Sequence, residues 1–592
     1  MELVTGIKQA VQTVLAEKYD YRIDIQEILV NETKPEFTGD YTVVLFAFSK
    51  ILKKSPDQLG KDLGEALLAL KPDWFSGYNI LKGFLNLVLA DDILTNFLEA
   101  QYSNVLFGIH EPGNRRVMVE YSSPNTNKPL HLGHLRNNFL GWSVAELYKV
   151  CGYDIIKTCI ANDRGIHICK SMVAWQQFAD GATPESTGIK GDHFVGDYYV
   201  LFGTELKKQV EAGISNGLSK ETAEKEAPLM KAAQQMLVDW EAGDPDVLKL
   251  WKMMNSWVYA GFDVTYKRIG SDFDKIYYES QTYLLGKDLV EMGLKKNVFF
   301  QKEDGSVWID LKSDGLDEKI VQRSDGTAVY MTQDIGLAVN KYEEYHAEKS
   351  IYVVADEQNY HFKVLKLICQ KLQLDTADGI YHLSYGLVEL PSGRMKTREG
   401  TVVDADDIID EMTGIAAKHT EELGKVSDFT PEERNELYDT IGLGALKFFL
   451  LRVDPKKRMV FNPDESIDFH GFTGPFIQYT HARIKSILRK ETLGVRKQES
   501  NSPLLPLEKE LIIALEKYSS LLQQACAEMN PSLVANYIFS VAKIFNSFYA
   551  EHSVGRAESE DKKQLRLRIC VMTANIIHSS MRVLGIRVPE RM

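Results

Sequence analysis

Residues 117–135 read VMVEYSSPNTNKPLHLGHL and combine the patterns of a strand, a polar loop and the start of a helix. Its first five residues, 117–121, form a short apolar run that is typical of a strand. A polar loop follows over 122–128, and a helical pattern starts near Gly133. A strand that leads through a loop into a helix is the first half of the unit from which parallel sheets are built.

The residues after Gly133 complete this unit. Leu140, Val144 and Leu147 stand at i, i+4 and i+7, and the helical pattern stops at Gly152, which is a usual stop residue. Residues 155–160 are again strand-like. The order strand, loop, helix, strand predicts an α/β fold with a parallel sheet.

The loop and the start of the helix, residues 124–134, suit a nucleotide. A helix N-terminus that follows a parallel strand offers N–H groups and a partial positive charge to phosphate. Gly133 has no Cβ, so a flat adenine can approach the backbone closely. His131 and His134 share one helix face and can donate to phosphate oxygens, and Lys128 adds a positive charge one turn upstream. Two histidines that merely cap an ordinary helix would give the same pattern, so both interpretations stay open.

A second loop, residues 392–400, reads SGRMKTREG and carries the cations Arg394, Lys396 and Arg398. Cations between glycines and after a strand suit a mobile clamp on a triphosphate. A charged surface hairpin has the same composition, so this loop alone decides little. No Gly–Lys pair in the sequence precedes Ser or Thr, so no competing P-loop is predicted.

The composition is that of a globular protein. Of 592 residues, 44 % are apolar and 26 % are charged, which excludes disordered and collagen-like chains and allows large cores. We expect no signal peptide and no stretch that spans a bilayer, and the six cysteines lack the spacing of a zinc or redox motif. We therefore expect a cytoplasmic protein without membrane contact. The net charge, 69 − 83 = −14, argues only weakly against nucleic acid, because a large protein can carry a local basic face.

Changes of pattern divide the chain into four expected parts. Residues 1–112 are expected to form a small α+β domain. Residues 113–400 are expected to form the α/β domain, with a helical insertion at about 170–265. A helical connector over 401–460 and a helical domain over 461–592 complete the expected organisation.

The two loops together resemble the HIGH and KMSKS signatures of class I aminoacyl-tRNA synthetases. Their surroundings resemble the arginyl-tRNA synthetase family in particular. The resemblance rests on four sequence segments. They are VEYSSPNTNKPLHLGHLR at 119–136, SDGTAVYMTQD at 324–334, DFHGFTGPFIQYTHAR at 468–483 and PERM at 589–592. The resemblance covers essentially the whole chain, including the N-terminal part around residues 38–41.

The resemblance implies a Rossmann-like catalytic domain that uses ATP and Mg²⁺ to convert L-arginine to arginyl-adenylate and pyrophosphate. The arginyl group then passes to the 2′-hydroxyl of the terminal adenosine of tRNA(Arg), and activation requires the bound tRNA. The N-terminal domain would touch the tRNA elbow, and the helical C-terminal domain would read the anticodon. The family also implies a monomer.

Two other functions stay open from the sequence. A small-molecule adenylyltransferase can share the HxGH unit, although it would not need the helical C-terminal domain. A catalytically silent relative that binds tRNA or serves as a scaffold is the second alternative. Such a protein should have lost loop residues, yet His131, His134 and Lys128 are all present.

Arginine's guanidinium is planar, always charged and carries five donors, so a selective pocket needs carboxylates and a neutral acceptor. The candidates that the resemblance supplies are Glu120, Asn125, Glu279, Tyr330, Asp334 and Gln358. Asp334 can meet the fork of the guanidinium, with Tyr330 beside it. Asn125 and Gln358 suit the amino and carboxylate ends of the substrate. A helix cap is the alternative role for Asp334.

The resemblance also supplies the catalytic and ATP-binding set, which is Lys128, His131, Gly133, His134, Arg394, Met395, Lys396 and Arg398. Thr397 stands where the general class I signature has a lysine that meets the ATP phosphates. Lys128 can reach the same phosphates from the other side, so we assign it to the charge that develops in the transition state. The three loop cations assist, and no protein metal ligand is predicted.

Two basic stretches, 481–497 and 561–592, offer the local positive charge that the net charge hides. Unstacked anticodon bases need aromatic faces and phosphate-binding cations. The candidate tRNA contacts are Phe476, Tyr479, Arg483 and Met592. The alternative is that the aromatic residues belong to the core and that the cations form a solvated helix face.

Overall fold

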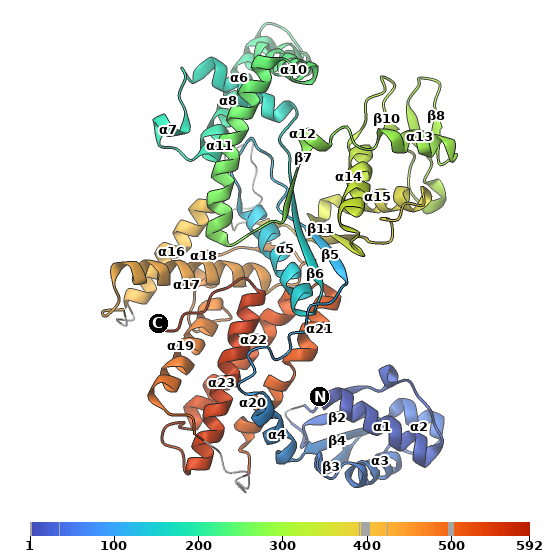
Figure 1. Cartoon of the computed structure of the whole chain (residues 1–592), viewed down its shortest axis with the longest axis vertical. Helices are drawn as coiled ribbons and strands as arrows, with labels where there is room; N and C mark the ends of the chain where they lie inside the picture. The colour runs from blue at the N-terminus through green and yellow to red at the C-terminus, as the bar shows by residue number, and fades with distance from the viewer. Residues whose placement is uncertain are drawn as a thin grey trace.

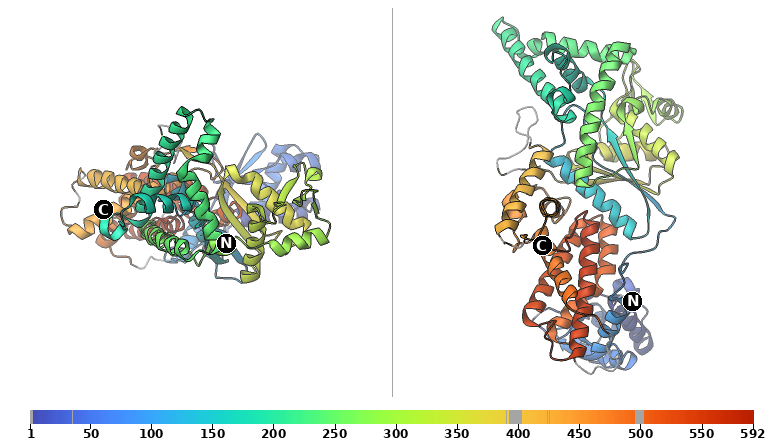
Figure 2. Two further views of the ribbon diagram at one scale, coloured as in Figure 1. Left: turned by 90° about the horizontal axis from the view of Figure 1, so that it is seen from above. Right: turned by 60° about the vertical axis from the view of Figure 1, so that its left-hand side comes forward.

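The computed structural model describes residues 3–34, 36–389, 391, 403–422, 424, 426–494 and 503–592. An α/β domain occupies the middle of the molecule, with a helical insertion above it and a helical bundle below (Figure 1). The two views of Figure 2 agree with this arrangement and show the small N-terminal domain beside the bundle. Every helix within these ranges is too short or too polar to span a bilayer.

A five-stranded parallel sheet forms the centre, in the order β12-β11-β5-β6-β7. Its strands are β5 (Arg116–Glu120), β6 (Asp154–Ala161), β7 (Lys275–Tyr278), β11 (Lys349–Ala355) and β12 (Ile380–Tyr385). The chain leaves the central β5 toward β6 on one side and later returns to β11 on the other side. Such a reversal opens a crevice at the carboxyl ends of the strands, where α/β proteins bind ligands. The prediction of an α/β fold with a parallel, Rossmann-like sheet is confirmed.

Helix α5 (Leu132–Val150) follows β5 and is buried on nearly all sides. Fifteen of its 19 residues are buried, which is typical of a helix between two layers rather than on a surface. One face contacts the sheet, and the other contacts helices of the C-terminal region. Gly141 permits the close approach to the sheet, because a Cβ there would lie 2.3 Å from the Cβ of Tyr121.

The N-terminal region forms a four-stranded antiparallel sheet in the order β1-β2-β4-β3. Its elements are α1 (Leu3–Tyr19), η1 (Ile25–Glu27), β1 (Val30–Glu32), β2 (Tyr41–Val44), α2 (Phe46–Leu52), α3 (Pro56–Leu70), β3 (Phe75–Leu81), β4 (Phe84–Leu89) and α4 (Asp91–Gln101). Lys509 of the helical bundle pairs with Asp40 at 2.9 Å, and the N–H of Leu3 donates to Glu516 at 2.7 Å. These contacts fix the N-terminal domain against the bundle.

The helical insertion lies between β6 and β7. Its helices are α6 (Ile166–Phe178), α7 (Pro184–Thr187), α8 (Gly191–Ser215), α9 (Lys220–Glu226), α10 (Pro228–Ala242) and α11 (Pro245–Ile269). Helices α8 and α11 run against each other, and α6 packs on α8. The insertion follows the carboxyl end of β6, which is the end of the sheet where the crevice is expected, and it stands above the sheet in Figure 1.

A second unit lies between β7 and β11 and contains a three-stranded antiparallel sheet in the order β10-β9-β8. Its elements are α12 (Glu279–Thr282), α13 (Lys287–Lys295), β8 (Phe299–Gln301), β9 (Val307–Ile309), η2 (Lys312–Asp314), β10 (Lys319–Gln322) and α14 (Tyr330–Tyr345). This small sheet was not predicted. Its strands span only three or four residues, which is too short for alternation to show.

The remaining elements are almost all helical, as predicted. They are η3 (Asp356–Gln358), α15 (Asn359–Lys371), β13 (Val388–Glu389), α16 (Ala405–Glu422), α17 (Pro431–Leu451), β14 (Met459–Val460), α18 (Pro463–Ser466), α19 (Gly474–Lys490), α20 (Pro506–Glu516), α21 (Tyr518–Glu528), α22 (Pro531–Glu551) and α23 (Glu560–Val583). The short β14 pairs in parallel with β13 and joins the helical part to the α/β domain.

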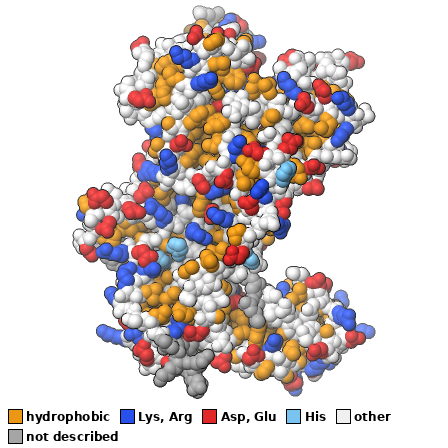
Figure 3. All heavy atoms as spheres, in the orientation of Figure 1, with side chains coloured by type: hydrophobic (Ala, Val, Ile, Leu, Met, Phe, Trp, Pro, Cys, Tyr) orange, Lys and Arg blue, Asp and Glu red, His pale blue; other side chains and the backbone are white. Residues whose placement is uncertain are grey.

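Several cations of the second basic stretch are buried, which corrects the expectation that residues 561–592 form one basic face. Glu508, which is fully buried, accepts from Lys562 at 2.6 Å and from Arg566 at 2.8 Å. Arg568, also buried, pairs with Glu99 at 2.9 Å. These cations connect α23 to α20 and α4. Basic and acidic side chains are accordingly interspersed on the face shown in Figure 3.

Replacement of Glu508 by alanine should destabilise the helical bundle strongly, because it leaves the buried Lys562 and Arg566 without their common carboxylate. We expect a loss of about 3–5 kcal/mol in urea denaturation followed by circular dichroism. Glu558→Ala is the matched control, because Glu558 pairs with the same Arg566 at 2.7 Å but is 54 % exposed. It should cost at most about 1 kcal/mol. Equal losses in the two variants would contradict the importance of the buried carboxylate.

Candidate active site

The residues of the first signature build a reciprocal cap at the start of α5. His131 is the N-cap, and its Nδ1 accepts a hydrogen bond from the Gly133 N–H at 3.1 Å. The N–H of His131 in turn donates to Nδ1 of His134 at 3.1 Å. The two ring centroids are 3.9 Å apart. Because both Nδ1 atoms accept, each imidazole carries its proton on Nε2.

Burial pushes the basic side chains at this cap toward their neutral forms. It lowers the pKa of His131 to about 3, with help from the charge of Lys128. It also lowers the pKa of His134 well below its usual value and lowers the pKa of Lys128. At neutral pH, two uncharged imidazoles therefore present Nε2–H donors close to one lysine. The histidines do cap the helix, as the alternative interpretation held, but the cap uses only Nδ1.

A pocket of 410 Å³ opens beside this cap, at the carboxyl ends of β5, β11 and β12. Its lining residues are Ser122, Ser123, His131, Gly133, His134, Asn137, Val353, Val354, Ala355, Glu357, Tyr385, Leu387, Val388 and Glu389. Asn137 connects its walls: its Oδ1 accepts from the Ser122 N–H at 2.5 Å, and its Nδ2 donates to Val353 O at 2.7 Å. The volume and the mixed apolar and polar lining are typical of a small-molecule site.

The second signature lies outside the described residues, and with it Arg394, Met395, Lys396, Thr397 and Arg398. The chain that follows is described and lies against the first signature. The N–H of Leu132 donates to Val403 O at 3.3 Å, and the N–H of Ala405 donates to Leu130 O at 3.0 Å. Residues 403–405, which follow the second signature, thus pair with the residues around His131.

Asp334 lies in the second turn of α14, where its Oδ2 is 2.6 Å from Nε2 of His361. The N-cap of this helix is Val329, so Asp334 is not a helix cap and that alternative was wrong. Tyr330 is 72 % exposed and lies one turn before Asp334. His361 was not predicted, because nothing in the sequence links it to an aspartate 27 residues away.

Glu279 starts α12 and lines, together with Tyr330, a second pocket of 510 Å³ between the insertion and α14. Burial, with smaller contributions from the negative charges of Asp163 and Asp334, raises the pKa of the Glu279 carboxyl to about 7. Arg164 opposes this shift and lies over the ring of Tyr283, with 4.1 Å from its Cζ to the centroid.

The three other candidate arginine contacts lie at or just after the carboxyl ends of strands. Glu120 ends β5, and its buried carboxylate pairs with the buried ammonium of Lys341 in α14. Asn125 is exposed in the loop after β5, where its backbone bridges to Asn162. Gln358 is exposed at the N-terminus of α15. The structure therefore places all six candidates around one edge of the sheet but leaves Glu120 engaged within the protein.

Asp163 is a residue of this edge that was not predicted. Its buried carboxylate accepts from the N–H and the hydroxyl of Ser280, at 2.8 and 2.7 Å, and from the hydroxyl of Tyr259 at 2.9 Å. It thereby ties the end of β6 to α12 and α11. Asp163 and Arg164 lie two and three residues after the end of β6. Polar residues just after a strand of a parallel sheet often lie at a ligand site, and this pattern in the sequence could have indicated both residues.

A groove of 880 Å³ lies between α19, the end of α22 and the C-terminal residues. Tyr479, Arg483 and Met592 line it, and the guanidinium of Arg483 lies 4.8 Å from the ring centroid of Tyr479. The other charged lining residues are Arg489, Lys490, Arg556 and Arg591, with Asp428 and Glu491. Phe476 packs instead against Phe539, with ring centroids 5.2 Å apart. Aromatic faces beside cations suit unstacked bases.

Three family models match the chain in succession. The arginyl tRNA synthetase N terminal domain matches residues 3–89. The catalytic domain of class I tRNA synthetases (R) matches residues 96–462, which is more than half of the chain. The DALR anticodon binding domain matches residues 477–592. The two pockets at the sheet fall within the second match, and the groove falls mainly within the third.

The arginine–tRNA ligases of Flavobacterium psychrophilum and Parabacteroides distasonis are each 50 % identical to this chain, with complete coverage of both partners. Among solved structures, the arginyl-tRNA synthetase of Thermus thermophilus has the same fold, with a TM-score of 0.79 at 23 % identity over the full length of both chains. The chain belongs to the arginyl-tRNA synthetase family, in class I of the aminoacyl-tRNA synthetases.

Proposed function

We propose that this chain activates L-arginine with ATP and then charges tRNA(Arg) with it. In the first step, a carboxylate oxygen of arginine attacks the α-phosphate, and arginyl-adenylate forms as pyrophosphate leaves. In the second step, the 2′-hydroxyl of the terminal adenosine takes the arginyl group and AMP leaves. The observation that supports the proposal is the reciprocal cap of His131 and His134, which leaves two Nε2–H donors and a helix N-terminus beside the 410 Å³ pocket, where phosphate could accept from them.

The nucleotide is proposed to bind in the 410 Å³ pocket, with its adenine against Gly133. His131 and His134 donate through Nε2 to triphosphate oxygens, and Lys128 meets the charge that develops on the departing pyrophosphate. Mg²⁺ is proposed to enter with the ATP phosphates rather than on a protein site. Arg394, Met395, Lys396 and Arg398 are assigned to the same phosphates from the sequence alone.

Arginine is proposed to bind across the ends of β6, β11 and α14. His361 contacts Oδ2 of Asp334, which supports a fixed orientation of this carboxylate toward the guanidinium. Tyr330 and Glu279 complete the guanidinium pocket. Asn125 and Gln358, which are both exposed at this edge, take the amino and carboxylate ends. Glu120, whose carboxylate pairs with Lys341, is proposed as a further contact to the substrate.

The tRNA is proposed to contact all three regions of the chain. Anticodon bases enter the groove at Tyr479, Arg483 and Met592. Phe476 lies on the same helix but packs against Phe539 and does not line the groove. The N-terminal domain meets the tRNA elbow, and bound tRNA is required before arginine is activated. We propose that the enzyme acts as a monomer in the cytoplasm.

Exchange of pyrophosphate with ATP tests this function directly. We expect exchange that requires both arginine and tRNA(Arg). Lysine should support exchange about 10⁴-fold less well, because its compact ammonium leaves acceptors built for a planar fork unpaired. Faster exchange with another amino acid would refute the arginine assignment, and rapid exchange without tRNA would refute the tRNA requirement.

Replacement of Lys128 by alanine tests the phosphate assignment. A cation that acts mainly in the transition state should lower kcat for exchange by about 10²–10³ when it is removed, while KM for arginine changes far less. Lys149→Ala, at the exposed far end of α5, is the control and should behave like the wild type. A normal kcat for Lys128→Ala would assign this charge to the cations of the second signature instead.

The pH dependence of arginine binding tests Glu279. Its pKa is raised to about 7 by burial, so the carboxyl is largely protonated below that pH and ionised above it. Since the ionised form binds a guanidinium more strongly, KM for arginine should fall about tenfold between about pH 6 and about pH 8. Glu279→Gln should remove this dependence, whereas Glu291→Gln, at an exposed position, should retain it. An unchanged pH profile in Glu279→Gln would exclude Glu279 as a contact.

A further inference from the structure

The insertion binds the carboxylate of Asp406, which lies outside the pockets described above. Asp406, near the start of α16, accepts from Lys190 Nζ at 2.6 Å and from the Thr265 hydroxyl at 3.0 Å. His193 Nε2 lies 3.1 Å from the same carboxylate. Lys190 and His193 belong to the N-terminal end of α8, and Thr265 belongs to α11. Two helices of the insertion therefore bind a single side chain of the helical connector.

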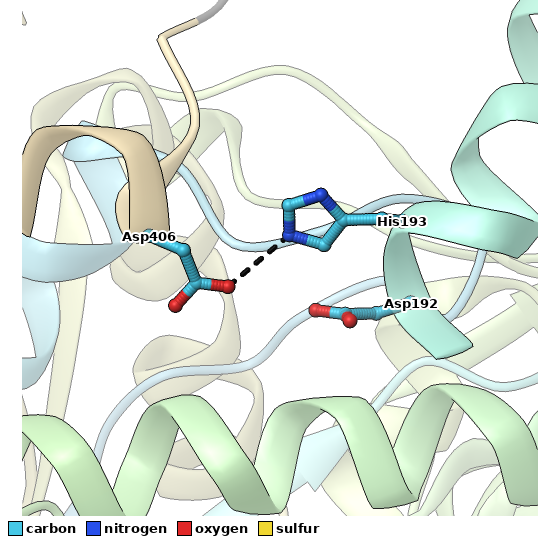
Figure 4. A group of neighbouring side chains, drawn as sticks. All are labelled: Asp192, His193 and Asp406. Carbon is cyan, nitrogen blue, oxygen red and sulfur yellow. Dashed lines mark hydrogen bonds and ion pairs between the residues drawn. The ribbon is translucent and has the colours of Figure 1, made fainter. Parts of the chain in front are cut away.

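A lysine supplies the positive charge in this cluster. Asp192, His193 and Asp406 point toward one another (Figure 4), with ligand atoms within 4.8 Å, as they would around a metal ion. Lys190 Nζ, however, pairs with Asp192 at 3.0 Å as well as with Asp406. The ammonium thus pairs with both carboxylates, and the group is an ion-pair cluster.

The helices around the cluster are packed at backbone distance. A Cβ on Gly191 would lie 2.1 Å from Trp257 O, and a Cβ on Gly261 would lie 2.2 Å from Asp192 Oδ1. Burial alone would raise the pKa of Asp406, yet its hydrogen-bonded cations hold that pKa well below the usual range. The carboxylate is consequently ionised at neutral pH and held in one place.

The segment just before this carboxylate forms a short antiparallel ladder with the first signature. The N–H of Leu132 donates to Val403 O at 3.3 Å. The N–H of Ala405 donates to Leu130 O at 3.0 Å, and the bridge between the two segments is centred on His131. The backbone from which the His131 imidazole projects is therefore supported by the residues that the insertion holds.

Helix α8 also lies directly on the loop that leads into His131. A Cβ on Gly196 would lie 2.8 Å from Cδ of Pro129 and 3.5 Å from the Cα of Lys128. The insertion thus contacts both segments of the ladder, one through backbone packing and the other through Asp406.

We propose that Asp406 is a positioning residue for adenylate formation. By anchoring residues 403–405 to the insertion, it fixes His131, and with it the His131–His134 pair, in the nucleotide pocket. The inference rests on the proposed function of that pocket and adds the insertion to the parts that set its geometry. A displacement of about 1 Å in a catalytic group costs about 10² in rate.

Asp406→Asn in the full-length enzyme, assayed by arginine- and tRNA-dependent exchange, tests this role. We expect kcat to fall about 10²-fold while KM for arginine stays close to that of the wild type, because the arginine contacts lie on other elements. Asp410→Asn is the matched control. Asp410 lies one turn later on α16 and pairs with Arg268 of α11 at 2.6 Å, so it also links the connector to the insertion, but it does not adjoin the ladder. It should retain nearly normal kcat.

A double-mutant cycle with His131→Asn distinguishes positioning from general damage. If Asp406 acts through His131, the double variant should have nearly the same kcat for exchange as His131→Asn alone. Lys190→Arg should retain most of the kcat for exchange, whereas Lys190→Met should lower kcat as much as Asp406→Asn does. If Asp406→Asn does not fold, Thr265→Val, which removes one donor, takes its place with a smaller loss in kcat.

A normal kcat for Asp406→Asn, an equal loss in Asp410→Asn, or losses that multiply in the double variant would each overturn the inference. The wild type is measured first. A wild type without arginine-dependent exchange would refute the proposed function itself, which separates that failure from a failure of the positioning role.

Discussion

The two hydrogen bonds of the reciprocal cap at the start of α5 are the constraint on which the rest of the site depends. A histidine that accepts through Nδ1 carries its proton on Nε2, so bonds made inside the protein decide which atoms face a ligand. His131 and His134 both obey this rule. Two protonated rings 3.9 Å apart would repel each other, and burial prevents this by keeping both neutral. The cap thus sets geometry, tautomer and charge together.

Buried cations that bond to backbone carbonyls hold α5 in place between the sheet and the helices. Arg136, one turn after the cap, donates to Pro455 O at 3.2 Å and to Lys457 O at 2.8 Å, and burial lowers its pKa to about 10. Lys447 of α17 donates to Gly585 O at 2.6 Å beneath the ring of Phe139. Backbone carbonyls at the ends of other elements therefore take the place of carboxylates as partners of these cations. Helix α5 is thereby fixed between the α/β domain and the helical bundle and supports both.

The sequence predicted local features well and distant partners poorly. The bounds of α5 followed from the spacing of Leu140, Val144 and Leu147 and from Gly152, since a helix is set by its own residues. The pairs of Asp334 with His361 and of Glu508 with Lys562 leave no such trace, because their partners meet only when the chain is folded. Counting cations along residues 561–592 therefore overestimated the positive surface. Likewise, the six candidate arginine contacts came from resemblance, and physical spacing alone would not have assembled them.

Ion pairs buried between distant segments recur throughout this acidic chain. A complete buried ion pair adds little to the free energy of folding, but a buried charge without its partner destabilises the fold strongly. Such pairs therefore favour the arrangement in which the elements that carry both partners meet. Glu120 with Lys341 and Asp406 with Lys190 are complete within the protein. Asp334 differs, because its carboxylate is 39 % exposed and only one of its oxygens contacts His361. In the proposed function, the guanidinium of arginine completes at Asp334 the kind of pair that elsewhere holds the fold together. Selectivity for a planar cation then follows from the same electrostatic rule as the architecture.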